Sequence, residues 1–414
     1  MVERAATGMN VLVINCGSSS IKYGVYKMPS RQLAGKGIVD RIGQKPSWLK
    51  YEHGDKKETR EVEIEDHRRA VHLILDSILD EKGGLIAGDE TIGAVGHRVV
   101  HGGTIESEAA FIDDEIMGVI QKFAPMAPLH NPPDLMAMQA VTERMSDVPQ
   151  VACYDTAFHH TIPEAAYLYG LPLRFYEEYG VRRYGFHGIS HHYVTARAAE
   201  ILARPVVEMN AITCHLGNGC SITAIHHGRS VDTSMGLTPL EGLLMGTRTG
   251  DIDPGALFHL IDKGVEVEDL RTIVNNESGL LGLSGVSRDM RDILRAASDG
   301  DERAAMALEV FCYRLRKYIG AYAAVVGELQ ALVFTGGIGE NAPEVRWKTC
   351  ADMRHLGIEI DAGRNEAAVG REEDISAGES RAKVLVIPTN EELAIAANAY
   401  RLLTSRSGVT AARP

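Results

Sequence analysis

Two short glycine-rich segments, about two hundred residues apart, constrain this chain more than any other feature. They are Val11-Leu-Val-Ile-Asn-Cys-Gly-Ser-Ser-Ser-Ile-Lys-Tyr-Gly-Val-Tyr26 and Ala211-Ile-Thr-Cys-His-Leu-Gly-Asn-Gly-Cys-Ser-Ile-Thr-Ala-Ile225. In each, an apolar run enters a turn of small polar residues and alternating apolar positions leave it, which predicts a β-hairpin. Glycine lets backbone N–H groups approach an anion closely. The pair therefore predicts two related halves that hold one polyphosphate.

Length and charge narrow the class of protein. At 414 residues the chain exceeds the size at which one core stops growing, so we expect two domains. The net charge of −13, with no long run of Lys or Arg, argues against a nucleic-acid partner. Met1 to Asn10 resemble no secretion signal, and no apolar run of about 18 residues occurs. We expect a cytoplasmic protein with no membrane span.

The cysteines show no Cys-x-x-Cys pair and lie mostly among apolar residues, which favours buried thiols over disulfides or zinc ligands. They are Cys16, Cys153, Cys214, Cys220, Cys312 and Cys350.

Apolar periodicity predicts an α/β chain. The expected elements are helices at 70–79 and 308–322 and strands at 91–95, 331–334 and 384–388. Ligands in open α/β sheets collect at the carboxyl ends of strands, where the polar motifs of this chain also lie.

Three further local features follow from composition. Thr389 and Glu392 have the spacing of a helix capping box. Segments 45–66 and 361–382 are charged and poor in apolar residues, which predicts surface hairpins or loops. The segment 404–414 is expected to fray.

The first glycine-rich turn combines groups that bind phosphate and magnesium. Asn15, Ser18 and Ser20 offer oxygen atoms, and Lys22 offers a positive charge on the strand face shared with both serines. An ordinary polar hairpin would explain the serines but not the lysine. In the second turn His215, Asn218 and Gly219 are the counterparts, although His215 alone could be structural.

Two arginines lie where helices are not expected. Arg98 falls within Gly96-His-Arg-Val-Val-His-Gly-Gly103, just after a predicted strand, and Arg248 lies between glycines in 246–254. A planar guanidinium suits a carboxylate or a phosphoryl group. Either arginine alone could be an ordinary surface residue, but with two phosphate-binding turns they favour a site that handles anions.

An acid and several histidines are further candidates. Asp155 follows an apolar run directly, as a catalytic carboxylate or as a helix N-cap would. His130 lies in a proline-rich segment and could contact substrate or be structural. The i, i+4 histidine pairs His187/His191 and His97/His101 lack the glutamate of a zinc hydrolase motif.

Nine motifs occur in the order found in one family. They are Val-Ile-Asn-x-Gly-Ser-Ser-Ser at 13–20, Gly-His-Arg-Val-Val-His-Gly-Gly at 96–103, Pro-Leu-His-Asn-Pro at 128–132, Asp-Thr-Ala-Phe-His at 155–159, Arg-Arg-Tyr-Gly-Phe-His-Gly at 182–188, His-Leu-Gly-Asn-Gly at 215–219, Gly-Thr-Arg-x-Gly-Asp at 246–251, Gly-Gly-Ile-Gly-Glu-Asn at 336–341 and Pro-Thr-Asn-Glu-Glu at 388–392. Over about residues 10 to 403, the chain resembles the acetate kinase family.

That resemblance implies the duplicated α/β fold of actin, an actin-like (ribonuclease H-like) fold with two domains and a central nucleotide cleft. The implied N-terminal domain covers 9–154 with 392–405, and the implied C-terminal domain covers 155–391. Residues 1–8 and 406–414 are expected to be disordered tails. The resemblance also implies a homodimer formed through the second domain and closure of the cleft on binding.

The resemblance assigns roles to individual residues. Asp155, His187 and Arg248 would be catalytic, and His187 and Arg248 would stabilise the transition state. Arg98 and His130 would bind the acyl substrate.

The implied metal ligands are Asn15 and Glu391. The implied nucleotide contacts are Lys22, Ser18, Ser20, His215, Leu216, Gly217, Asn218, Gly219, Asp289, Met290, Arg291, Gly337, Ile338, Gly339, Glu340 and Asn341. Cys16 and Thr249 depart from the residues common in the family, Ala and Ser, but neither departure removes a ligand.

The activity implied is reversible transfer of a phosphoryl group from ATP to acetate, giving acetyl phosphate and ADP, with Mg²⁺ or a substituting Mn²⁺. Transfer would be direct and in line, with Asp155 positioning arginines or water rather than acting as an obligatory base. Propionate or butyrate kinases of the same family remain alternatives. A polyol kinase would not need Arg98, and an ATP-binding switch could lack both arginines.

Overall fold

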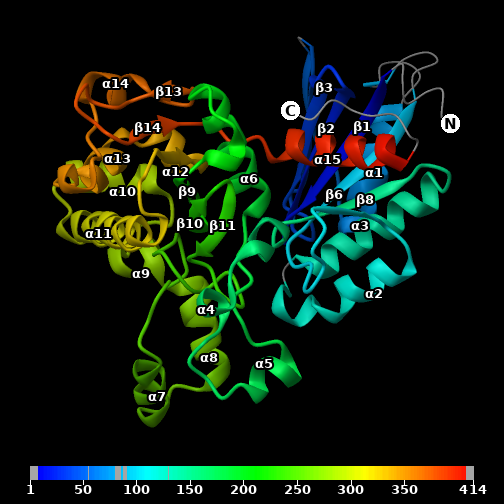
Figure 1. The fold of residues 1–414 in the computed structure, drawn as a ribbon. Coiled ribbons are helices and arrows are strands. Elements are labelled where there is room, and N and C mark those ends of the chain that lie inside the picture. The colour runs from blue at the N-terminus through cyan, green and yellow to red at the C-terminus, as the bar shows by residue number, and fades with distance from the viewer. Residues whose placement is uncertain (1–7, 55, 80–84, 87–90, 129, 407–414) are drawn as a thin grey trace. The chain divides into compact units, whose positions relative to one another are not determined.

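The computed structural model describes residues 8–54, 56–79, 85–86, 91–128 and 130–406. The chain forms two compact units (Figure 1). Unit 1 comprises Met1–Ala157 and Asn390–Pro414, and unit 2 comprises Phe158–Thr389. Each unit is built on its own β-sheet.

The sheet of unit 1 has the strand order β5-β4-β3-β2-β1-β6-β8-β7. Strands β1, β2 and β3 form an antiparallel meander, whereas β6 and β8 are parallel to β1. The strands are β1 (Met9–Cys16), β2 (Ser20–Met28), β3 (Gln32–Asp40), β4 (Trp48–His53), β5 (Lys56–Glu61), β6 (Ile92–Val99), β7 (Ala109–Phe111) and β8 (Gln150–Tyr154).

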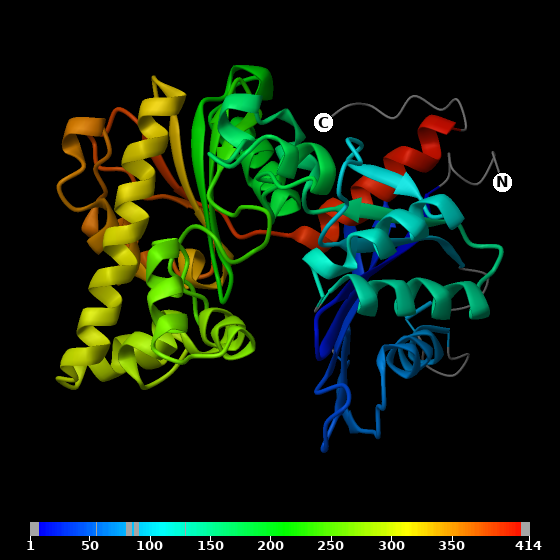
Figure 2. The ribbon, with the colours of Figure 1, turned by 90° about the horizontal axis from the view of Figure 1, so that it is seen from below.

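Helices cover both faces of this sheet. The alternation of side chains along β1 sends Leu12 and Ile14 into a core shared with α1 and α3. Helix α15 lies on the other face of the sheet (Figures 1 and 2). There its Ile395 lies against Gly96 of β6. The helices are α1 (His67–Leu79), α2 (Asp114–Lys122), η1 (Ala124–Met126), α3 (Asn131–Arg144) and α15 (Glu391–Arg406).

The sheet of unit 2 has the order β11-β10-β9-β12-β14-β13. Again the first three strands are antiparallel, and β12 and β14 run parallel to β9. The strands are β9 (Ala211–Leu216), β10 (Cys220–His226), β11 (Arg229–Thr233), β12 (Ala331–Thr335), β13 (Glu373–Asp374) and β14 (Lys383–Val386).

Helices α6 and α11 lie on opposite faces of the unit 2 sheet (Figure 2). The helices are η2 (Ala157–Thr161), which begins at the unit boundary, α4 (Glu164–Tyr167), α5 (Arg174–Tyr179), α6 (Gly188–Ile201), η3 (Val206–Glu208), α7 (Pro254–Asp262), α8 (Val267–Thr272), the π-helix η4 (Ile273–Glu277), α9 (Gly279–Ser284), α10 (Met290–Ser298), α11 (Glu302–Val326), α12 (Gly336–Asn341), α13 (Pro343–Cys350), η5 (Arg354–Leu356) and α14 (Ala362–Ala367).

The two sheets repeat one topology. In each, a three-stranded antiparallel meander is extended on the side of its first strand by two parallel strands. This repetition confirms the predicted duplicated actin-like α/β fold, and both glycine-rich segments form the predicted hairpins, β1–β2 and β9–β10.

Several local predictions are also confirmed. Helix α1 buries the predicted apolar face, and α11 contains the predicted long helix. Segment 45–66 contains the β4–β5 hairpin. All six cysteines are buried and free of disulfides. Within the described part of the chain, no helix combines the length and apolarity needed to cross a bilayer.

Three local predictions are wrong. Segment 361–382, expected to form hairpins or loops, contains the helix α14. Arg98 belongs to strand β6 rather than to a turn after it, because the parallel ladder between β6 and β8 continues through Val99. The predicted Thr389/Glu392 capping box does not form. Asn390 caps α15 instead, since its Oδ1 accepts from the Leu393 N–H at 3.0 Å, while the Thr389 hydroxyl bonds Ser190.

The sequence-based domain limits remain a prediction about folding domains. Contacts place Asp155 and Glu391 in unit 1, a few residues from the expected boundaries at 154 and 392. The predicted tails at 1–8 and 406–414 fall outside the described residues except for Gly8 and Arg406, and Arg406 ends α15.

A buried histidine predicts how unit 1 responds to acid. Burial lowers the pKa of His97 from 6.5 to about 4, although its Nε2 bonds Gln150 at 2.8 Å. Because the folded pKa is below the unfolded one, this contribution to stability is complete above pH 6.5 and is lost as the pH falls toward 4. Between pH 7 and 4.5 the free energy of unfolding should therefore fall by about 2–3 kcal/mol less in His97→Gln than in the wild type.

Trp48 in unit 1 and Trp347 in unit 2 are the two tryptophans of the chain. In a Trp347→Phe background, urea unfolding followed by Trp48 fluorescence therefore reports on unit 1. The exposed His355 provides a control through His355→Gln. An equal loss of stability on acidification with and without His97→Gln would contradict the prediction.

Candidate active site

In unit 1, the β1–β2 hairpin presents Asn15, Ser20 and Lys22 on one strand face. The Gly17 N–H donates to the Ser20 carbonyl at 2.7 Å and closes the turn. Asn15 and Lys22 are direct partners across the antiparallel ladder, so their side chains share a face. Ser18 and Lys22 are exposed, and Ser20 is half-buried. Oxygen ligands and a cation therefore lie close together, as the sequence predicts.

The parallel strands bring two more predicted residues, Arg98 and Asp155, to Asn15. Arg98 of β6 donates from Nε and Nη2 to Oδ2 of Asp155, at 3.1 and 2.5 Å, and from Nη1 to Oδ1 of Asn15 at 3.3 Å. Asp155 follows β8 directly and is fully buried. Its Oδ1 is also buried and has no hydrogen-bond partner among the described residues. We call Asn15, Arg98 and Asp155 the Arg98 cluster.

The Arg98 charge interacts with two nearby carboxylates, Asp155 of the cluster and Glu391. Burial lowers the pKa of Arg98, but Asp155 and Glu391 raise it by more, so the guanidinium stays protonated. Burial raises the pKa of Glu391, an effect opposed by Arg98 and increased by Asp155. A bound cation would relieve the repulsion between these two carboxylates.

Sequence reasoning missed Asp134, which lies in the first turn of α3 and is 2% exposed. Burial raises the pKa of Asp134 well above its usual value, against the effect of the Arg98 charge. An acid directly before the apolar Leu135, at the start of a helix, was the available signal. His130 directly precedes α3, and its carbonyl accepts from the Asp134 N–H at 3.0 Å.

In unit 2, three predicted residues converge on the β9–β10 turn. The ring of His187 stacks on that of His215, with centroids 4.2 Å apart. A β-carbon added to Gly219 would lie 3.3 Å from His187 Nε2 and 3.5 Å from Arg248 Nη1, so glycine leaves room between them. His187 has a φ of 57°, a left-handed conformation that costs about 1–3 kcal/mol and often occurs at functional sites.

Arg248 differs from Arg98 in its surroundings. Its Nη1 donates to the Pro239 carbonyl at 3.1 Å, and no carboxylate pairs with it in the described ranges. Burial lowers the pKa of Arg248. The loop that carries it is joined to the turn, since the Gly246 N–H donates to the Asn218 carbonyl at 3.0 Å. A largely buried guanidinium with neutral partners is suited to receive an anion.

The other predicted nucleotide residues form a third glycine-rich segment and a helix start. Residues 336–341 form helix α12, and the space that a Gly337 side chain would occupy is open. Glu340 Oε1 accepts from the Gly336 N–H at 2.8 Å, so this carboxylate faces the segment itself. Asp289 caps α10 and pairs with the exposed Arg291, while Met290 is buried.

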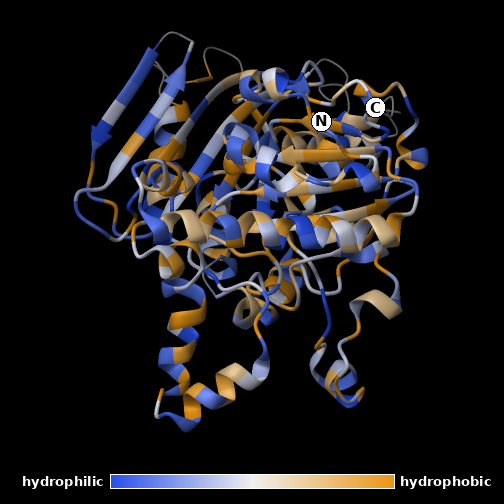
Figure 3. Cartoon of the chain, turned by 90° about the vertical axis from the view of Figure 1, so that its left-hand side faces the viewer, coloured by the Kyte–Doolittle hydropathy of each residue, from blue (hydrophilic) through white to orange (hydrophobic). Residues whose placement is uncertain are grey.

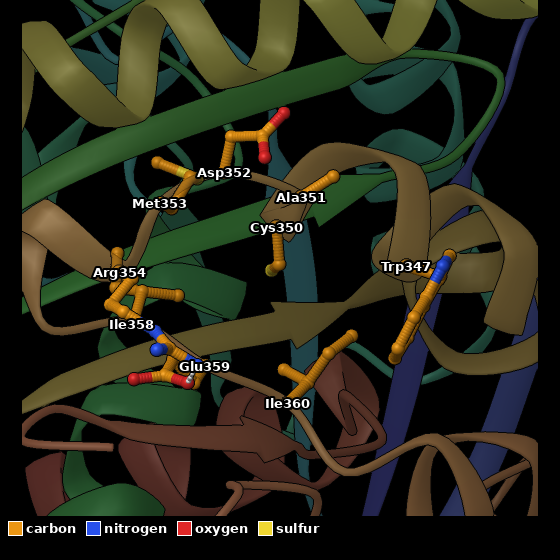
Figure 4. Close-up of a pocket in the computed structure, with 9 residues that line it drawn as sticks. All are labelled: Trp347, Cys350, Ala351, Asp352, Met353, Arg354, Ile358, Glu359 and Ile360. Atoms are coloured by element: carbon orange, nitrogen blue, oxygen red, sulfur yellow. Dashed lines mark hydrogen bonds and ion pairs between the residues drawn. The ribbon is translucent and has the colours of Figure 1, made fainter. Parts of the chain in front are cut away.

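A cavity of about 600 Å³ elsewhere in unit 2 contains none of the predicted residues. Figure 4 shows its lining, in which Arg354 and Glu359 form an ion pair at 2.7 Å. The lining residues are Trp347, Cys350, Ala351, Asp352, Met353, Arg354, Ile358, Glu359 and Ile360. The candidate site is therefore defined by the turns and not by this cavity.

Comparison with known proteins decides the family. The model of the acetokinase family matches residues 10–397. This chain belongs to the acetokinase family. Acetate kinase from Halothermothrix orenii is 50% identical over 399 residues, covering 96% of this chain and all of the relative.

Solved structures of family members agree with this assignment. The acetate kinase of Porphyromonas gingivalis has a TM-score of 0.90 at 45% identity, covering 95% of this chain and 100% of that one. A propionate kinase from Francisella tularensis has a TM-score of 0.88 at 38% identity, covering 94% and 98%. The acetokinase match therefore extends over both units.

Stability measurements can test the pairing inside the Arg98 cluster. Asp155→Asn leaves the largely buried Arg98 charge without its partner, so we expect a loss of about 3 kcal/mol in the free energy of unfolding of unit 1. The exposed pair of Arg144 and Asp76, at 2.6 Å, is a matched control. Asp76→Asn should cost less than about 1 kcal/mol. Urea unfolding followed by Trp48 fluorescence checks both, and equal losses would contradict the prediction.

Proposed function

We propose that this acetokinase family member is an acetate kinase, a phosphotransferase that moves the γ-phosphoryl group of ATP reversibly to acetate. Relatives named acetate kinase, about 50% identical over nearly the whole chain, support the substrate assignment. The structural observation that carries the proposal is Arg248. It is a largely buried guanidinium without a carboxylate partner in the described chain, and it lies beside His187 at Gly219.

Unit 2 would bind the nucleotide. Backbone N–H groups of a glycine-rich turn can hold phosphate oxygens, and the β9–β10 turn and the segment 336–341 are both glycine-rich. We propose the contacts named above at 215–219, 289–291 and 337–341. For Glu340 the side chain supports the segment's backbone, so the proposed contact there is main-chain.

Unit 1 would bind the acyl carboxylate through Arg98. Two of its N–H groups already point at Asp155 Oδ2, which fixes the plane of the guanidinium. This geometry supports Asp155 as a positioning group rather than a base. Because an acetate carboxylate is already ionised at pH 7, the reaction needs no base to deprotonate the nucleophile.

The residues of unit 1 also suit the divalent metal that the family implies. Asn15 and Glu391 offer amide and carboxylate oxygens, which Mg²⁺ prefers and Mn²⁺ accepts. Burial raises the pKa of Glu391, and the Asp155 charge adds to this effect, so a nearby cation would favour the ionised carboxylate. The metal, when bound, neutralises charge on the phosphate oxygens. Lys22, Ser18 and Ser20 would contact phosphate from the same turn.

Transfer of a phosphoryl group between two anions is mainly a problem of position and charge. In a loose, in-line transition state, negative charge spreads over the three equatorial oxygens. Arg248 and His187 would donate hydrogen bonds to these oxygens. Among the described residues no carboxylate competes for Arg248, which leaves its charge available for this purpose.

A coupled assay tests the function directly. MgATP is supplied with acetate, propionate, butyrate or glycerol, acyl phosphate is trapped as its hydroxamate, and ADP release is followed. We expect the strongest hydroxamate signal with acetate. A stronger signal with propionate or butyrate would instead indicate a propionate or butyrate kinase of the same family. Such a preference is possible because one methylene contributes only about 1–3 kcal/mol of discrimination between substrates. ADP release without hydroxamate would favour a polyol kinase or an ATP-binding switch.

Arg248→Lys separates geometry from charge. We expect kcat to fall more than about a hundredfold, or about 2.7 kcal/mol in the activation barrier, because lysine cannot reproduce the planar fork. Steady-state kinetics with saturating acetate and MgATP measures this loss. The exposed Arg229 provides the control, since Arg229→Lys should leave kcat within about twofold. A loss below about tenfold for Arg248→Lys would contradict the transition-state role.

We further propose that the enzyme is a cytoplasmic homodimer. ATP as donor and six free, buried thiols support a reducing compartment. Helix α7 and the start of α8 expose apolar side chains, with Phe258 66% and Val267 54% exposed. Figure 3 shows orange segments on the helices that project below the sheet of unit 2.

A charge placed on this surface tests the dimer. Phe258→Glu should convert the protein to a monomer in light scattering, because burying a carboxylate in an apolar interface is unfavourable. Leu33 of unit 1, 41% exposed, is the control, and Leu33→Glu should leave the mass unchanged. A monomeric wild-type protein, or a dimeric Phe258→Glu variant, would contradict the proposal.

A further inference from the structure

A line of hydrogen bonds joins two glycine-rich segments of unit 2. His215, at the end of β9, bonds through Nδ1 to the Ser190 hydroxyl at 2.8 Å. That hydroxyl bonds the Thr389 hydroxyl, also at 2.8 Å. The Thr389 N–H donates to Glu340 Oε1 at 3.1 Å, and the same oxygen accepts from the Gly336 N–H at 2.8 Å. We call Ser190 and Thr389 the hydroxyl bridge.

The bridge residues come from elements far apart in the sequence. Ser190 lies in the first turn of α6 and is fully buried, and Thr389 follows β14 as the last residue of unit 2. Serine in a helix often bonds the carbonyl four residues earlier. The Ser190 hydroxyl instead has two side-chain partners outside its helix, so it serves a tertiary contact.

Direct packing brings the same two segments together. Gly336 has a φ of 76°, and a β-carbon there would lie 2.8 Å from the Leu216 carbonyl oxygen. The backbone of the β9–β10 turn therefore touches the start of α12. Packing limits how closely the segments 215–219 and 336–341 approach each other. The hydroxyl bridge limits how one segment can rotate relative to the other. A buried polar network with satisfied partners favours one arrangement.

The direction of the hydrogen bonds in the bridge decides which nitrogen of the His215 ring carries the hydrogen. If Thr389 donates to Ser190 and Ser190 donates to Nδ1, the ring hydrogen lies on Nε2. This is the form that can donate to a phosphate oxygen, and Nε2 lies 4.0 Å from the β-carbon position of Gly217 in the turn. The opposite direction would place a lone pair on Nε2, which repels phosphate.

We infer that Ser190 and Thr389 are positioning residues that hold the segments 215–219 and 336–341 in the arrangement that binds nucleotide phosphates. The inference rests on the proposed nucleotide role of unit 2. Neither residue is a predicted contact to ATP, so both act through His215 and Glu340.

Nucleotide binding measured without catalysis tests the inference. Isothermal titration with MgADP should give a dissociation constant about tenfold higher for Ser190→Ala than for the wild type. In steady-state assays, the KM for ATP should rise by a similar factor while the KM for acetate stays within about twofold. A general loss of structure would not separate the two substrates in this way.

Ser221 supplies the matched control. Like Ser190 it is a fully buried serine bonded to a buried histidine, since its hydroxyl lies 3.1 Å from His191 Nε2, but it is outside the bridge. Ser221→Ala should leave MgADP binding within about twofold. Equal losses in Ser190→Ala and Ser221→Ala would overturn the inference.

Thr389 gives a second, independent pair of variants. Thr389→Val removes the hydroxyl with little change of shape and should weaken MgADP binding about as much as Ser190→Ala. Thr389→Ser keeps the hydroxyl and should restore most of the affinity. The double variant Ser190→Ala/Thr389→Val should lose little more than either single one, because both break the same link.

The possible failures are distinguishable. A wild-type protein that does not bind MgADP would contradict the proposed function. If the wild type binds MgADP and both Ser190→Ala and Thr389→Val bind it within twofold of the wild type, only the inferred role of the hydroxyl bridge is overturned. If Ser190→Ala does not fold, the comparison of Thr389→Val with Thr389→Ser decides, and equal affinities for those two overturn the inference.

Discussion

Parallel pairing of the central strands is the constraint on which the candidate site depends. In unit 1 the ladders that join β1, β6 and β8 bring Asn15, Arg98 and Asp155 within hydrogen-bond distance, although 140 positions separate the first from the last. In unit 2 the pairing of β12 with β9 aligns Thr335 with His215, which places the start of α12 beside the β9–β10 turn. Since the topology is duplicated, parallel pairing positions candidate site residues in both units in the same way.

Arg98 and Arg248 carry their charge in different ways. Arg98 has a buried carboxylate partner, which holds its guanidinium in one plane and offsets the cost of burial. Arg248 is held by a carbonyl group and a packed loop, without that compensation. The first arrangement suits the orientation of a substrate already charged in solution. The second suits stabilisation of charge that concentrates during a reaction.

The sequence could predict features that depend on local pattern. Both hairpins and the helix α1 follow from periodicity and glycine placement, and the order of nine motifs identified the family. The end of β6 was misjudged because the glycines around Arg98 resemble a turn, whereas pairing with β8 extends the strand. The surroundings of Asp134 and Ser190 could not be predicted, because their partners come from distant segments.

Helix α15 has a consequence for how the protein is made. It covers the face of the unit 1 sheet that includes Gly96, yet its residues follow all of unit 2 in the chain. On the ribosome, at about 5–20 residues per second, that face waits on the order of ten seconds or more for its cover. Unit 2 is complete in sequence before unit 1 can close its core. Unit 1 is therefore the first unit to be synthesised and the last to complete its fold. The apolar face of its sheet needs protection from aggregation during this interval.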